Sequence, residues 1–294
     1  WFKKMIKKGI ILAGGHGTRM GALTKAVNKQ LLPIYDKPLI FYPLSVLMLA
    51  GIKDILIIVN KGQLDQFKKI LPNGNNLGIK ITYIQQEYPK GLPDAFLLGE
   101  NFIGNNNVAL ILGDNFFFGQ SLTNKLKDAV KLNSGATIFL HPVKNPKAYG
   151  VAKIDKRKRV IKIVEKPKFN FSNFAVTGLY FFDNKVINYS KSLKQSKRKE
   201  IEIVDLLNKY RKSRKLKAEF LGRGGAWLDA GSVTDLYNTS SFVSTIENRQ
   251  GFKIACLEEI ALNNKWIKKS VIKKSIKFYG KCDYSKYLNT LLKK

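Results

Sequence analysis

The sequence has 294 residues, of which 45% are hydrophobic and 11% are aromatic. This composition supplies a large buried core and excludes an intrinsically disordered chain. Fifty-two basic residues against 21 acidic ones give a formal net charge of +31, a surplus that by itself indicates a nucleic-acid-binding protein.

Lysine accounts for most of this surplus. The chain has 44 lysines and eight arginines, and the lysines are spread along its whole length. A surface that binds nucleic acid more often concentrates arginine and interleaves it with aromatic residues. The lysines accompany abundant asparagine, isoleucine and phenylalanine, all encoded by A/T-rich codons, so drift in base composition explains them. We therefore expect no nucleic-acid partner and keep a nucleic-acid-binding protein as the alternative from another class.

Two further features concern location. No apolar run approaches the length of a membrane span, and residues 1–8 lack the apolar core and cleavage site of a signal peptide. Cys256 and Cys282 have no metal-ligand spacing, which predicts free thiols in a reducing compartment. The sequence thus predicts a cytoplasmic protein without a membrane partner.

A glycine-rich loop follows the first apolar run. Residues 10–12 predict a buried strand, and Gly14, Gly15 and Gly17 come soon after it. Glycine accepts positive φ, and a strand followed by such a turn exposes backbone N–H groups that can bind phosphate oxygens. Arg19 adds a planar positive group two residues later. The spacing matches neither the dinucleotide-binding fingerprint nor the P-loop, so an ordinary tight turn remains an alternative.

Strands and helices alternate after this loop. The pattern predicts strands at residues 53–60, 79–85 and 108–112, and helices at residues 39–50, 64–71 and 93–100. Such alternation predicts an α/β fold with a Rossmann-like, mostly parallel sheet and helices on both faces. Right-handed connections place the carboxyl ends of the strands at one edge of the sheet, where ligands bind.

An acidic residue stands at this edge. Asp114 follows the predicted strand 108–112 after a single glycine, and Asn115 comes next. A carboxylate at a strand end is well placed to hold Mg²⁺ over a polyphosphate. An aspartate here can equally cap the next helix or form an Asx turn, and the position alone leaves both interpretations open.

The pattern changes from about residue 134. Strands predicted at residues 136–140, 149–154, 160–165 and 175–182 indicate an inserted, more antiparallel region that could enclose a second substrate. Helices are predicted at residues 200–213 and 233–249, and short helices from residue 250 to the last residue.

Five segments together resemble the sugar-phosphate nucleotidylyltransferase family, and most closely its bacterial thymidylyltransferase branch. The similarity runs in order from about Gly9 to the last residues, which makes it far more specific than any one motif. The segments are residues 14–19 (GGHGTR), 29–38 (KQLLPIYDKP), 112–115 (LGDN), 176–180 (VTGLY) and 226–229 (AWLD).

The resemblance implies a Mg²⁺-dependent reaction of dTTP with glucose 1-phosphate that gives dTDP-glucose and pyrophosphate for cell-surface polysaccharide synthesis, including the dTDP-rhamnose route. Such chemistry depends on positioning and electrostatics rather than on a protein nucleophile. It also implies a catalytic domain at residues 5–245, with a nucleotide half at 5–133 and a sugar-binding half at 134–245. Residues 246–294 would form a C-terminal helical packing or oligomerisation element, and family members are usually homotetramers.

The resemblance also implies roles for individual residues. The nucleotide-binding residues would be Leu12, Gly14, Gly15, Gly17, Thr18, Arg19, Lys29, Gln30, Gln86 and Gly91. The sugar-phosphate-binding residues would be Asn115, Tyr149, Gly150, Glu165, Lys166, Asn173, Val176 and Arg198. Asp114 and Asp229 would hold Mg²⁺, and the catalytic residues would be Arg19, Lys29, Asp114 and Lys166. His16 receives no role.

The chain departs from the family pattern without losing an implied metal ligand or phosphate-binding cation. The unusual residues are Ala22, Pro93, Asp94, Lys199, Gly225 and Ala230. Of these, Asp94 would repel a phosphate if its side chain faced the nucleotide. The remaining alternatives are a uridylyl- or cytidylyltransferase of the same fold and a catalytically weakened relative with a regulatory role.

Overall fold

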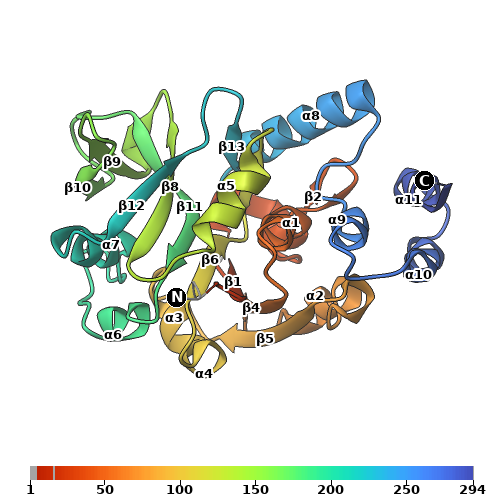
Figure 1. The fold of residues 1–294 in the computed structure, drawn as a ribbon, viewed down its shortest axis with the longest axis horizontal. Helices are drawn as coiled ribbons and strands as arrows, with labels where there is room; N and C mark the ends of the chain where they lie inside the picture. Colours follow the sequence, from red (N-terminus) through yellow and green to blue (C-terminus); the bar gives the residue numbers. More distant parts are fainter. Residues whose placement is uncertain (1–4, 16, 294) are drawn as a thin grey trace.

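One nine-stranded mixed sheet runs through the protein in the computed structural model, which describes residues 5–15 and 17–293 (Figure 1). His16 therefore lies outside the described residues. The main path of the sheet has the order β10-β9-β11-β6-β1-β4-β5, and β8 lies between β11 and β12. The strands are β1 (Lys8–Ala13), β4 (Asp54–Asn60), β5 (Lys80–Gln86), β6 (Val108–Leu112), β8 (Ala136–Pro142), β9 (Gly150–Ile154), β10 (Val160–Glu165), β11 (Phe174–Phe182) and β12 (Leu216–Phe220).

The helices cover both faces of this sheet, and the last three lie at the end of the molecule opposite the antiparallel strands (Figure 1). The α-helices are α1 (Phe41–Leu49), α2 (Leu64–Ile70), α3 (Asp94–Leu98), α4 (Glu100–Ile103), α5 (Leu122–Ala129), α6 (Val186–Lys191), α7 (Ile203–Lys212), α8 (Val233–Gln250), α9 (Leu257–Asn263), α10 (Lys269–Tyr279) and α11 (Asp283–Lys293). Short 3₁₀ turns include η1 (Thr18–Thr24), η2 (Lys29–Leu31), η3 (Asn75–Leu77) and η4 (Pro146–Ala148).

The parallel half of the sheet consists of β5, β4, β1 and β6, as predicted. Successive side chains of a strand point to opposite faces of the sheet. The strands of this half are apolar on both faces because each face is covered by a core. Ile11 and Ile57 belong to one core with α1, whereas Ile10 and Leu56 belong to a second core with α3. The predicted strand bounds are confirmed to within one residue for β4, β5 and β6.

The antiparallel half is joined to the parallel half through β11. Along one edge, β11 pairs with β6 at residues 179–182 and with β9 at residues 174–175, and β8 occupies its other edge. The predicted antiparallel region is thus confirmed. One strand differs, because β12 was not predicted and runs parallel to β8.

A small two-stranded sheet brings the two halves together at the site. Strand β7 (Asn115–Phe118) pairs antiparallel with β13 (Ala226–Asp229), and Asn115 lies opposite Asp229 in the register. Two predicted functional segments more than 100 residues apart in the chain are therefore direct neighbours.

Some predicted helices differ from the observed ones. The single helix predicted at residues 93–100 is two short helices, α3 and α4, with Gly99 between them. Helices α5 and α6 were not predicted, because their polar and lysine-rich segments show only a short apolar stripe. The predicted C-terminal helices are confirmed as α9, α10 and α11.

A closed ring of four charges, two of them buried and two half-buried, fastens the end of α8 to a hairpin near the start of the chain. The hairpin consists of β2 (Pro33–Ile34) and β3 (Lys37–Pro38). Lys37 Nζ lies 2.5 Å from Asp36 Oδ1 and 2.9 Å from Glu247 Oε1. Lys253 Nζ lies 2.5 Å from Asp36 Oδ2 and 2.8 Å from Glu247 Oε2. Two cations and two carboxylates balance, so losing any one leaves a buried charge uncompensated.

Two expectations from composition can be compared with the structure. Cys256 and Cys282 are free thiols, as predicted. Within residues 5–15 and 17–293, no helix has both the length and the apolar character needed to cross a membrane.

Candidate active site

Two adjoining cavities open at the carboxyl ends of β1, β5 and β6. Their volumes are about 230 Å³ and about 720 Å³. Both are lined by Leu92, Leu112, Asp114 and Glu200, which form the wall between them. Parallel strands end at this edge, so the two cavities lie at the edge of the sheet where the sequence predicts that ligands bind.

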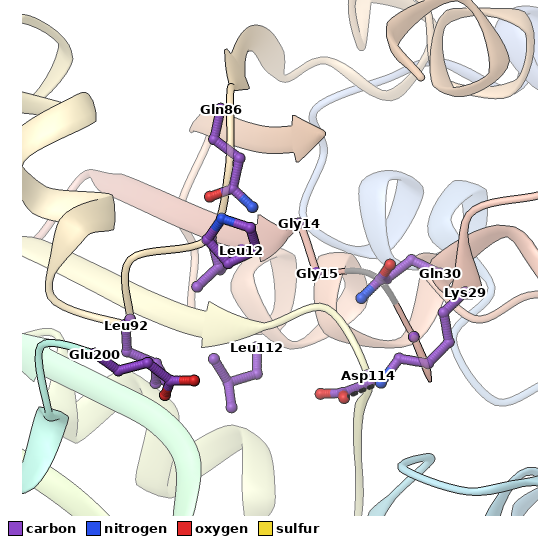
Figure 2. Close-up of a pocket in the computed structure, with 13 residues that line it drawn as sticks. Leu12, Gly14, Gly15, Lys29, Gln30, Gln86, Leu92, Leu112, Asp114 and Glu200 are labelled. Atoms are coloured by element: carbon purple, nitrogen blue, oxygen red, sulfur yellow. Dashed lines mark hydrogen bonds and ion pairs between the residues drawn. The ribbon is translucent and has the colours of Figure 1, made fainter. Parts of the chain in front are cut away.

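The smaller cavity brings together most of the predicted nucleotide-binding residues (Figure 2). Thr18 and Arg19 instead line the larger cavity. The predicted residues that line the smaller one are Leu12, Gly14, Gly15, Gly17, Lys29, Gln30, Gln86 and Gly91.

Asn60 holds the glycine loop in place, a role that we did not predict. Its Oδ1 accepts a hydrogen bond from Gly15 N at 3.0 Å, and its Nδ2 donates to Gly15 O at 2.9 Å. The same Oδ1 accepts from Gln86 Nε2 at 3.0 Å. The available signal was a polar residue at the carboxyl end of a buried strand, on the same edge as the loop.

Gly91 is needed for a close approach of two backbones. Its φ is +110°, and a Cβ at this position would lie 2.1 Å from the carbonyl oxygen of Ile201. Ile201 N also donates to Lys90 O at 2.8 Å. This contact carries the neighbouring Glu200 to the wall of both cavities, a position that the sequence did not reveal.

The larger cavity brings together most of the predicted sugar-phosphate-binding residues. Asn173 is the exception, because it is exposed and lies outside the residues that line either cavity. The predicted residues that line the larger cavity are Asn115, Tyr149, Gly150, Glu165, Lys166, Val176 and Arg198.

Lys166 reaches this cavity from a strained position. It follows directly on β10 with φ +42°, and its backbone N–H donates to Tyr149 O at 3.0 Å. Non-glycine residues in this region are uncommon and are often found at functional sites. The strained turn places a cation at the cavity wall.

Carboxylates surround Arg198. Its Nε and Nη2 donate to the two oxygens of Glu202 at 3.0 and 2.7 Å, and Glu165 lies 3.6 Å away. Glu200 is a third acidic neighbour at 3.7 Å. Burial, followed by the negative charge of Glu202, raises the pKa of Glu165. Arg198 thus balances acidic groups in the cavity wall, and its predicted contact with a phosphate stays a prediction.

Asp114 is held from both sides. Lys29 Nζ forms an ion pair with Oδ2 (Figure 2). Asn115 Nδ2 donates to Oδ1 at 3.0 Å. The oxygen of Asn115 accepts from Trp227 Nε1 at 2.6 Å and from Gly178 N at 3.1 Å. The Asn115 amide therefore orients Asp114, and its predicted contact with the sugar phosphate stays a prediction.

Asp229 also lines the larger cavity, where Tyr149 Oη donates to its Oδ1 at 2.8 Å. Burial raises the pKa of Asp229, and the charges of Asp114 and Asp235 raise it further. Among the described residues, no group of three or more histidine, cysteine, aspartate or glutamate side chains could hold a metal. A cation at Asp114 and Asp229 would thus need further oxygens from substrate and water, the usual arrangement for Mg²⁺.

Arg19 lies closer to Asp229 than we expected for a residue of the nucleotide loop. A Cβ placed on Gly231 would be 3.1 Å from Arg19 Nη2 and 3.1 Å from Asp229 Oδ2. Arg19 is exposed and lines the larger cavity. Arg19 and Lys29, both predicted to bind the nucleotide and to be catalytic, thus each lie near a carboxylate that is predicted to hold the metal.

Comparison with known proteins identifies the family. The family model described as nucleotidyl transferase matches residues 8–246, which include every residue of both cavities. The chain belongs to the nucleotidyl transferase family. The predicted resemblance is confirmed, and the protein is a nucleotidyltransferase.

Similar members of the nucleotidyl transferase family include a glucose-1-phosphate thymidylyltransferase of Neisseria meningitidis, 50% identical over 287 residues, 98% of this chain and 100% of that protein. A crystal structure from Bacillus anthracis, provisionally described as a glucose-1-phosphate thymidylyltransferase and bound to sucrose, matches with a TM-score of 0.74 and 38% identity. It covers 80% of this chain and 94% of that one. A UDP-glucose pyrophosphorylase bound to UDP-glucose matches with a TM-score of 0.72 and 28% identity, over 82% and 100% of the two chains.

Two of the departures from the nucleotidyl transferase pattern lie away from the cavities. Asp94 is 7% exposed at the start of α3, burial raises its pKa, and it is not among the residues that line either cavity. Its carboxylate is thus not placed to repel a phosphate there. Ala230 contacts the site through its backbone, because its N–H donates to Asp114 O at 2.9 Å. The small alanine side chain does not affect this backbone hydrogen bond.

Proposed function

We propose that the protein transfers a thymidylyl group from dTTP to α-D-glucose 1-phosphate and so forms dTDP-glucose and pyrophosphate. The observation that carries the proposal is the pair of adjoining cavities with Asp114 in their shared wall. One cavity contains the residues expected for a nucleotide, and the other contains those expected for a sugar phosphate. The name of the relative that is 50% identical over nearly the full length supports the same substrates.

The reaction joins two anions. An oxygen of the sugar phosphate bonds to the α-phosphorus of dTTP, the bond to the bridging oxygen breaks, and the electron pair leaves with pyrophosphate. Lys166 would hold the attacking phosphate in the larger cavity. Lys29 and Arg19 would balance the charge that collects on the leaving pyrophosphate. No protein nucleophile and no proton transfer are needed.

We infer that Asp114 and Asp229 hold Mg²⁺. Their carboxylates offer hard oxygen ligands, and they are close enough for the charge of Asp114 to raise the pKa of Asp229 beyond the effect of burial. When bound, Mg²⁺ would neutralise phosphate charge between the two substrates. Tyr149 and Asn115 would hold the two carboxylates in position through the hydrogen bonds to Asp229 and Asp114.

A uridylyltransferase is the second candidate. It is favoured by the likeness to the UDP-glucose pyrophosphorylase structure, which covers 82% of this chain at a TM-score of 0.72. The proposed reaction is otherwise the same, so the base alone distinguishes the two candidates. The chain belongs to the nucleotidyl transferase family, and no observation supports nucleic-acid binding as its main function.

The test measures pyrophosphate release from dTTP, UTP or dCTP with glucose 1-phosphate, over a titration of Mg²⁺ and with a chelator. We expect release with dTTP to exceed that with the other nucleotides and to disappear when the chelator removes the metal. A preference for UTP would favour the second candidate. Release from no combination of nucleotide and sugar phosphate would contradict both.

We propose further that the product serves cell-surface polysaccharide synthesis, including the dTDP-rhamnose route, and that the protein is a cytoplasmic homotetramer. These proposals are supported by the family resemblance, because a role in this synthesis and a homotetrameric assembly are usual in the family. Light scattering coupled to size-exclusion chromatography measures the assembly directly. A monomer at the concentration of the assay would contradict the tetramer.

A further inference from the structure

Asn60 is the last residue of β4, and its side chain links the glycine loop to Gln86. Its oxygen accepts hydrogen bonds from Gly15 N and from Gln86 Nε2, both at 3.0 Å. Its nitrogen donates to Gly15 O at 2.9 Å. Asn60 lines neither cavity, whereas Gln86 is buried in the wall of the smaller one.

The backbone of Gly15 fixes which way the Asn60 amide points. A backbone N–H only donates and a carbonyl oxygen only accepts, so a reversed amide would lose both hydrogen bonds and place like groups in contact. Since Asn60 Oδ1 must face Gly15 N, it presents an acceptor to Gln86. Only the amide nitrogen of Gln86 can donate to it, which turns the Gln86 oxygen Oε1 away from Asn60.

Gly14 makes this arrangement possible. A Cβ on Gly14 would lie 1.7 Å from Gln86 Nε2 and 2.5 Å from its Cδ. Gly14 is not among the residues with positive φ, so the requirement for glycine is steric. Figure 2 shows the Gln86 amide beside Gly14, with its nitrogen on the side of the glycine loop and its oxygen on the opposite side.

We propose that Asn60 is a positioning residue that selects the base of the nucleotide through Gln86. The inference rests on the proposed function, and it takes Gln86, which is predicted to bind the nucleotide and lines the smaller cavity, to contact the base. With its nitrogen turned to Asn60, Gln86 offers the acceptor Oε1 to a base. Thymine and uracil carry an N3–H donor, whereas cytosine in the same pose directs the N3 lone pair at Oε1. Asn60 thus favours thymine and uracil over cytosine without touching the nucleotide.

Two substitutions at this position separate positioning from simple support of the loop. Asn60→Leu removes the acceptor, so Gln86 can rotate freely. Asn60→Asp keeps an acceptor for Gly15 N and Gln86 Nε2 but places an oxygen against Gly15 O, which weakens the loop without freeing Gln86. The measurements are the dissociation constants of dTTP and dCTP by calorimetry without sugar phosphate, and kcat/KM for each nucleotide.

We expect Asn60→Leu to weaken dTTP binding about fivefold, the effect of losing the one hydrogen bond between Gln86 and the base, and to lower the preference for dTTP over dCTP by about the same factor. Asn60→Asp should keep the preference even though its melting temperature falls. Gly14→Ala displaces the Gln86 amide and should reproduce the loss of preference. Combining it with Asn60→Leu should add little, because both act through the same side chain.

Two results would overturn the inference while the proposed function stands. In the first, Asn60→Leu weakens both nucleotides equally and keeps the wild-type preference. In the second, Asn60→Asp loses the preference as fully as Asn60→Leu, which would mean that Asn60 only supports the loop. A wild-type protein that binds neither nucleotide would overturn the proposed function and this inference together.

Discussion

The indole N–H of Trp227 donates to the side-chain oxygen of Asn115 at 2.6 Å, from a strand that begins about 110 residues further along the chain. Gly178 N donates to the same oxygen, so the Asn115 nitrogen must face Asp114. Three separate segments of the fold therefore determine the orientation of one carboxylate. Hydrogen bonds from neighbouring residues commonly orient the carboxylates that bind a metal and so affect its affinity.

Trp227→Phe tests this arrangement, because it keeps an aromatic ring but removes the donor. We expect kcat/KM to fall about fivefold, in line with about 1 kcal/mol for one hydrogen bond. The Mg²⁺ concentration for half-maximal activity should rise as Asp114 loses its fixed orientation. Trp266→Phe, at a half-buried tryptophan outside both cavities, is the control. An unchanged Mg²⁺ requirement in Trp227→Phe would show that Asn115 is oriented without the indole.

Asp114→Asn removes one charge and keeps the shape of the side chain. We expect turnover to fall by about 100-fold or more, because the implied metal loses a carboxylate and Lys29 loses its ion pair. Circular dichroism should report an unchanged fold. The control is Asp65→Asn, on the exposed face of α2. Normal turnover in Asp114→Asn would place the metal elsewhere.

Lys29→Met removes the buried cation of the smaller cavity and keeps its apolar stem. Lys29 is 9% exposed and forms an ion pair with Asp114, so the substitution leaves that carboxylate without its cation. We expect kcat to fall about 100- to 1,000-fold, with a smaller change in KM for glucose 1-phosphate. Lys25→Met, at an exposed lysine nearby in the chain, should behave like the wild type. Equal losses in both variants would indicate a general charge effect.

Gly91→Ala introduces two separate costs, a left-handed φ and a collision with Ile201 O. Gly62→Ala is a matched control, because Gly62 has φ +81° but no atom lies within 4 Å of its Cβ. The control should lose about 1–2 kcal/mol of unfolding free energy from backbone strain alone. Gly91→Ala should lose more and should raise KM for dTTP, as measured by denaturant unfolding and steady-state kinetics. Equal stability losses would mean that the two backbones can separate freely.

Glu258→Gln tests a buried acid in the C-terminal helices. Glu258 is fully buried in α9, and burial raises its pKa in the folded state. The folded state then binds the proton more tightly than the unfolded state, so stability is full below the unfolded pKa of about 4.3 and falls as pH rises towards the folded pKa.

The neutral amide should remove this loss, because it can still accept the hydrogen bond from Tyr284 Oη. We expect Glu258→Gln to match the wild type near pH 4 and to exceed its unfolding free energy at pH 8 by on the order of 1 kcal/mol. Glu259→Gln, at a half-buried acid in the same helix, is the control. Identical pH profiles for the wild type and Glu258→Gln would refute the prediction.

The sequence predicted secondary structure best where a run of apolar residues forms a strand that is buried on both faces. Strands β4 and β6 were predicted to within one residue, because uninterrupted apolar runs are typical of strands covered on both faces. The pairing of β7 with β13 could not be predicted, because each has four residues and the contact depends on the path of about 100 residues between them.

The site was predictable as a set of residues, and less so as a set of contacts. Family motifs identified residues that the structure gathers around two cavities, apart from Asn173. The roles of Asn60 and Trp227 depend on partners 45 and 112 positions away, so neither motif nor periodicity reveals them. For Arg198 the motif identified the residue, but its three acidic neighbours become apparent only in the structure.

The ring of charges formed by Asp36, Lys37, Glu247 and Lys253 limits how this protein can exchange parts with its relatives. A chimera that took residues 246–294 from another enzyme would replace Glu247 and Lys253 but keep Asp36 and Lys37. Unless the donor carried matching charges, the junction would bury an unbalanced ion. The hairpin and the segment that carries Glu247 and Lys253 would therefore have to be exchanged together, although about 200 residues separate them in the chain.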